Sequence, residues 1–119
     1  MFGEYKAVLN YQLPKDALKT VLYDAADRYL ALHQNVFPIN RQDSSIEFKV
    51  QKSSLSRGEI VVISIENKAF CAVSRHIGES PQSIGGWIKN RHNIITLSTY
   101  VQDAVSELSE LDATGVRCS

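Results

Sequence analysis

The stretch "EIVVISIE", residues Glu59–Glu66, decides the fold of this 119-residue chain. It is rich in β-branched residues, which favour a strand, and it is apolar on both faces for most of its length. Such a strand lies at the centre of a covered sheet, or has one face against a partner. The rest of the chain must therefore supply neighbouring strands and a cover for at least one face.

The neighbouring segments supply these strands. Before the central stretch, "SIEFKVQK" (45–52) alternates apolar and polar residues, as a strand with one buried face does. After it, Asn67 and Lys68 predict a tight turn into a further strand, "AFCAVSRHI" (69–77). The serine-rich "SSLSRG" (53–58) has the composition of a hairpin loop. Sequential hairpins of this kind predict an antiparallel sheet.

The N-terminal third predicts one more strand and a helix. "EYKAVLNYQL" (4–13) alternates, and Pro14 then ends the strand and opens a helix in "PKDALKTVLYDAADRYLALHQ" (14–34). The apolar stripe expected on this helix consists of Leu18, Val21, Leu22, Ala25, Tyr29 and Leu32. "NVFPIN" (35–40) is either a connector or a short strand, since Pro38 disfavours a central position.

A long helix is expected at the C-terminal end, beginning near Trp87 and ending near Leu108 or Leu111. Its expected apolar face consists of Ile88, Ile95, Val101, Val105 and Leu108. We therefore expect a single α+β domain over residues 1–111 and a flexible tail over residues 112–119.

The order of elements defines the fold class. It is α+β: an antiparallel sheet of four to five strands with two helices on one face, in the order β-α-β(3–4)-α. Such a sheet leaves its other face to meet water, a ligand or a second subunit.

Composition excludes several classes of protein. Formal net charge is zero, with a modest basic excess over residues 41–91, so nucleic-acid binding is not favoured. Apolar runs are too short for a transmembrane helix, and the N-terminus lacks the pattern of a signal peptide, which predicts a cytoplasmic protein. Cys71 and Cys118 form no CxxC or His/Cys cluster, so no metal or cofactor is expected.

The stretch "SPQSIGGWIKNRHNII" (80–95) is the best candidate for a site. Its two glycines before Trp87 either let the helix cross the sheet closely or expose amides that receive an anion, with Lys89 and His92 nearby. Arg75, at the end of a strand, could line the same rim. No GxSxG or HExxH motif supports an enzyme, and His33, at a helix end, is explained as a cation favoured by the helix dipole.

Three motifs between Ser53 and Asn93 carry a resemblance: a "KSS…GE" hairpin, a strand with "VSR", and a W-x-K-N-x-x-N helix start. Together they resemble short uncharacterised bacterial cytoplasmic proteins, in which glycine usually follows the tryptophan; here Ile88 takes that place. The resemblance implies a bacterial cytoplasmic origin and no activity. The element order is also similar to TATA-binding-like (β-α-β4-α) and helix-grip folds, which host several functions.

Two functions follow as hypotheses. The first is binding of a partly apolar small molecule in a cavity between sheet and helix, where Trp87 forms an aromatic wall and Arg75, Lys89 and His92 orient an anionic end. The second is a homodimeric interaction module without a ligand, because the central strand is apolar on both faces.

Overall fold

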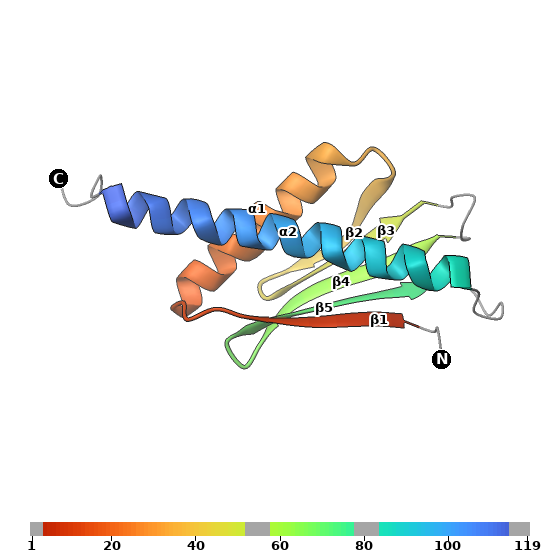
Figure 1. Cartoon of the computed structure of the whole chain (residues 1–119), viewed down its shortest axis with the longest axis horizontal. Helices are drawn as coiled ribbons and strands as arrows, with labels where there is room; N and C mark the ends of the chain where they lie inside the picture. The colour runs from red at the N-terminus through yellow and green to blue at the C-terminus, as the bar shows by residue number, and fades with distance from the viewer. Residues whose placement is uncertain (1–3, 52–57, 78–83, 115–119) are drawn as a thin grey trace.

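The computed structural model describes residues 4–51, 58–77 and 84–114 and has the predicted α+β architecture (Figure 1). The described residues form five strands and two helices in the order β-α-β-β-β-β-α. Their bounds are β1 Glu4–Asn10, α1 Lys15–Leu32, β2 Val36–Gln42, β3 Ser45–Val50, β4 Glu59–Glu66, β5 Ala69–His76 and α2 Ile84–Thr114. Loop residues 53–57 and the tail beyond Thr114 lie outside the described residues.

Strand β4 occupies the centre of the sheet, as its sequence predicts. The strands lie in the order β1-β5-β4-β3-β2, and each is antiparallel to its neighbours. The predicted tight turn joins β4 to β5, and both of its residues have positive φ, 52° at Asn67 and 64° at Lys68. This backbone matches the right-handed twist of the two strands that it connects.

Strand β2 resolves the question about "NVFPIN": it is a strand at the edge of the sheet. Its pairing with β3 shifts between Pro38 and Asn40. Proline has no backbone N–H to donate, so an edge position or an irregular pairing is where a strand tolerates it. The irregularity also makes this edge a poor template for a further strand.

One face of the sheet packs against both helices. Alternate residues of the central strands, among them Phe48, Ile63 and Phe70, are fully buried on this face. Helix α1 contributes Leu18, Val21, Leu22, Ala25, Ala26 and Tyr29 to the same core. The expected Leu32 does not belong to it and is 65% exposed. The stripe continues instead from Tyr29 to the partly buried His33, and the two rings are 5.2 Å apart.

Helix α2 crosses the same face and is longer than predicted, running from Ile84 to Thr114 (Figure 1). The prediction for its apolar face was wrong at two positions, since Ile88 and Ile95 are 49% and 43% exposed. Its buried stripe is Asn90, Asn93, Ile94, Leu97, Val101 and Ala104. In the N-terminal turns of α2 this stripe consists of the polar residues Asn90 and Asn93, so hydrophobicity alone predicted the wrong buried face there. Val105 and Leu108 pack against the core as expected.

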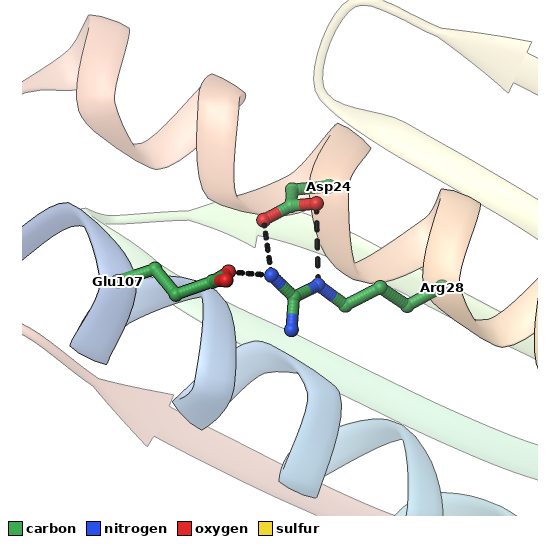
Figure 2. Close-up of polar contacts among 3 residues, drawn as sticks. All are labelled: Asp24, Arg28 and Glu107. Atoms are coloured by element: carbon green, nitrogen blue, oxygen red, sulfur yellow. Dashed lines mark hydrogen bonds and ion pairs between the residues drawn. The ribbon is translucent and has the colours of Figure 1, made fainter.

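The two helices are also linked at their surface by three charged side chains (Figure 2). Arg28 on α1 lies 3.2 Å from the Asp24 carboxylate one turn earlier, and the same guanidinium contacts Glu107 on α2. Partly exposed ion pairs stabilise a fold only weakly. The packing of α1 on α2 therefore depends mainly on the shared core. Among the described helices, none combines the length and apolar character needed to cross a membrane.

Candidate functional site

Four polar side chains are buried together beneath the N-terminal half of α2, and we call Glu59, Ser74, Asn90 and Asn93 the polar cluster. The Asn93 amide donates hydrogen bonds to Glu59 Oε1 at 2.9 Å and to Ser74 Oγ at 3.2 Å. The Ser74 hydroxyl in turn donates to Asn90 Oδ1 at 2.8 Å. Buried polar groups need such partners, because an unmet donor or acceptor loses its hydration without compensation.

Regular secondary structure places each member of the cluster. Glu59 begins β4 and Ser74 lies on β5, both on the side of the sheet that faces the helices. Asn90 and Asn93 are three residues apart on α2, so both lie on one face of the helix. The cluster therefore continues the apolar core toward one end of the sheet.

Glu59 is the unusual member, because it is an ionisable residue whose exposed fraction is zero. Burial raises its pKa, since the charged form loses hydration, while the hydrogen bond from Asn93 and the positive fields of Lys89 and His76 partly oppose this. Two buried nitrogens nearby, His76 Nε2 and Asn90 Nδ2, have no hydrogen-bond partner among residues 4–51, 58–77 and 84–114. The cluster is thus chemically distinct from the rest of the core.

A small cavity adjoins the polar cluster where the end of α1 meets α2. Its volume is about 20 Å³, which is room for one water molecule. Its lining consists of Tyr29, His33, Asn35, Val36, Val50, Lys89, His92, Asn93 and Thr96. Lys89 and His92 of α2 therefore meet apolar and amide groups at this cavity.

The surroundings of His33 at the cavity differ from those of the simple helix-end cation that its position suggested. One ring nitrogen, Nε2, is 2.8 Å from the Tyr100 hydroxyl, which joins the end of α1 to α2. Burial lowers the pKa of His33, and the positive fields of His92 and Lys89 lower it further. Burial also raises the pKa of the neighbouring Tyr29 hydroxyl, with Glu59 and Tyr100 adding to the effect. His33 and Tyr29 therefore both favour their neutral forms.

The structure brings together two of the four residues expected at a ligand rim. Lys89 and His92 line the same cavity. Arg75 is exposed, and its alternation with buried Ser74 places it on the opposite face of the sheet. Trp87 lies in the first turns of α2, and its side chain is outside the described residues.

Sequence reasoning did not assign Glu59, Ser74, Asn90 and Asn93 to a site, although a signal was present. These four residues belong to the "GE", "VSR" and W-x-K-N-x-x-N motifs, which are far apart in the chain and meet in the polar cluster.

Comparisons with protein-family models, with curated proteins and with solved structures found no match.

An open groove of about 440 Å³ lies at the other end of the sheet, beside the turn between β4 and β5. Residues 10–13, Asn67 and Lys68 line it. Its volume falls in the range of small-molecule sites. None of Arg75, Lys89 and His92 contributes to it, so it is separate from the rim that the sequence predicted.

The second surface of interest is the face of the sheet that points away from both described helices, which we call the open face. Its centre is apolar, with Ile60, Val62 and Val73 partly exposed on β4 and β5. On the neighbouring strand β1, Val8 is 56% exposed. Charged residues surround this centre on β1, β3 and β5: Glu4, Lys6, Glu47, Lys49 and Arg75.

Proposed function

We propose that the protein is a homodimeric interaction module in which the open face of one copy packs against the open face of a second. The supporting observation is the central strand β4. Its alternate residues Val61 and Ile63 are buried under the helices, while Ile60 and Val62 are partly exposed on the open face. Two sheets that pack face to face about 10 Å apart cover such residues with each other.

The open face has the composition of an interface. An apolar centre within a polar rim is the common pattern of protein–protein contacts. Val8, at 56% exposure, extends the apolar centre onto β1. The edge strand β2 is less suited to pairing with a second copy, because its own pairing with β3 is irregular at Pro38.

The test compares two matched charge insertions by light scattering during gel filtration. Val62→Lys places a charge at the centre of the open face, and Ile95→Lys places one on the exposed side of α2. We expect dimers for the wild type and Ile95→Lys, and a folded monomer for Val62→Lys, with circular dichroism verifying the fold. A wild-type monomer at the highest soluble concentration, or a dimeric Val62→Lys, contradicts the proposal.

A second candidate function is the binding of a partly apolar small molecule with an anionic end, and the observation that favours it is the shared cavity of Lys89 and His92. Val36 and Val50 give that cavity an apolar wall. With room for one water molecule, it accepts only a terminal group of a ligand. Such a ligand is held at the mouth of the cavity rather than enclosed in the core.

Native mass spectrometry of the purified protein, before and after denaturation, tests this candidate. We expect mass above that of the polypeptide that disappears on denaturation. Lys89→Ala should lose this mass, while Arg75→Ala, on the opposite face, should retain it. A bare polypeptide mass, or equal retention by both variants, contradicts this function.

A further inference from the structure

The register of the sheet arranges the open face in three rows across β1, β5, β4 and β3. The first row is Glu4, Arg75, Ile60 and Lys49. The second row is Lys6, Val73, Val62 and Glu47. The third row is Val8, Cys71, Ser64 and Ser45. Each row runs perpendicular to the strands.

The ends of the two charged rows carry opposite charges in reversed order. The first row begins with an acid on β1 and ends with a base on β3, whereas the second begins with a base and ends with an acid. Three strand spacings separate the ends of a row, about 14 Å, so they do not pair within one chain. A surface with this pattern is complementary to its own copy after a suitable rotation.

We propose that two copies pack about a two-fold axis that runs parallel to the strands, between β4 and β5. This axis pairs Lys6 with the partner's Glu47, and Glu4 with the partner's Lys49. This geometry rests on the proposed homodimer. A rotation about such an axis returns each row to itself and exchanges β1 with β3 and β5 with β4. Both charged rows then meet with opposite charges in register.

The same axis brings apolar groups together at the centre. Val73 faces the partner's Val62, and by symmetry Val62 faces the partner's Val73. In the third row Cys71 faces the partner's Ser64, so the row of Val8 also remains covered. A closed two-fold arrangement needs this kind of self-complementary patch.

Arg75 excludes the two neighbouring axes that run parallel to the strands. An axis along β5 places Arg75 against its own copy, and an axis along β4 places it against the partner's Lys49. Like charges in register oppose association. With the axis between the strands, Arg75 faces the partner's Ile60, and its charged cross-strand neighbour in the first row is Glu4 of its own chain.

An axis perpendicular to the strands is the remaining competitor. Placed between the first two rows, it pairs Lys6 with the partner's Glu4 and Glu47 with the partner's Lys49. It also moves Cys71, Ser64 and Ser45 of the third row past the ends of the partner's β5, β4 and β3, so that they no longer face strand residues of the partner. The parallel axis keeps all three rows in contact and is therefore favoured.

Charge-reversal variants separate the two arrangements. Lys6→Glu alone places like charges in register at two symmetric positions in either dimer, so we expect its dissociation constant to rise at least about tenfold. Adding Glu47→Lys restores attraction under the parallel axis only. Adding Glu4→Lys restores it under the perpendicular axis only. Sedimentation equilibrium at low salt measures each constant, and circular dichroism verifies that each variant is folded.

The outcomes distinguish this geometry from the homodimer itself. Recovery to within a few-fold of the wild type by Lys6→Glu/Glu47→Lys, and not by Lys6→Glu/Glu4→Lys, supports the parallel axis. The opposite recovery overturns it in favour of the perpendicular axis. A wild-type dimer that is indifferent to all three variants overturns the charge pairing while the homodimer stands. A wild-type monomer overturns both proposals.

Discussion

The two ends of the core beneath α2 are built from different chemistry. Toward its C-terminal half, α2 packs Ile94, Leu97 and Val101 on the apolar residues of α1 and the sheet. Toward its N-terminal end it presents Asn90 and Asn93, which belong to the polar cluster. The apolar end gains free energy from every buried group in proportion to area. The polar end depends instead on the hydrogen bonds among its side chains, because a buried group that loses its partner is not compensated for its lost hydration.

This difference teaches that equal burial does not mean equal contribution. Phe48 and Glu59 both have zero exposed area. Removing the first loses transfer free energy and leaves a cavity, while changing the second alters charge and hydrogen bonding at little change in volume. Substitutions at the two ends should therefore differ in how much they change the free energy of unfolding, and in how that change depends on pH.

The largest effect is expected at the apolar end, for Phe48→Ala. The ring of Phe48 packs edge-on against Tyr29, with centroids 5.2 Å apart, and is completely buried. Truncation should lower the free energy of unfolding by about 3–5 kcal/mol. Phe37→Ala, at a position 45% exposed on β2, is the matched control and should cost far less. Urea denaturation at one fixed protein concentration gives both values, and equal losses would contradict the assigned core.

A smaller loss is expected at the polar end, for Asn93→Ala. This substitution removes the donor to both Glu59 and Ser74. We expect the free energy of unfolding to fall by about 1–3 kcal/mol. Thr99→Ala removes an exposed hydroxyl from the same helix and should change it by about 0.5 kcal/mol or less. If the two variants are equally stable, the hydrogen bonds of the polar cluster do not contribute.

Glu59→Gln sharpens the comparison through pH. Burial raises the pKa of Glu59, so between the unfolded and folded pKa values the folded protein holds more protons, and stability falls as the pH rises. Glutamine keeps an acceptor for Asn93 without the charge. The variant should therefore gain stability relative to the wild type as the pH rises, with the gain levelling off above the folded pKa.

Chemical denaturation across the acidic and neutral range measures this gain. Glu66→Gln, at the exposed end of the same strand, controls for the loss of one negative charge. If the stability difference between Glu59→Gln and wild type does not grow with pH, burial of the charged carboxylate does not destabilise the fold.

The sequence predicted the apolar end of the molecule better than the polar end. The alternation in β3, the two-sided apolar run of β4 and the periodic stripe of α1 identified the sheet, its central strand and the helix that covers one face, because burial of apolar groups follows secondary-structure periodicity. The same rule failed in the N-terminal turns of α2, although it held for Val101, Val105 and Leu108. Ile88 and Ile95 were assigned to the core, but Asn90 and Asn93 occupy that face and meet Glu59 and Ser74 across the fold.

The candidate site was predicted only in part, for a related reason. Lys89 and His92 are close in the chain and lie on one helix, so their common cavity follows from local spacing. The separation of Arg75 from them depends on which face of β5 points toward the helices, and the register of the whole sheet sets that direction. Contacts between distant segments require the fold before they can be assigned.

The smallest effect is expected outside the core, at the ion pairs that join α1 and α2 (Figure 2). A double-mutant cycle with Arg28→Ala and Glu107→Ala isolates the contact between the helices from the Asp24 contact within α1. We expect a coupling of about 0.2–1 kcal/mol, because both side chains are partly exposed and solvent screens them. Added salt should reduce it further. A coupling that equals the Phe48→Ala loss would mean that surface charge, rather than the shared core, determines how the two helices pack.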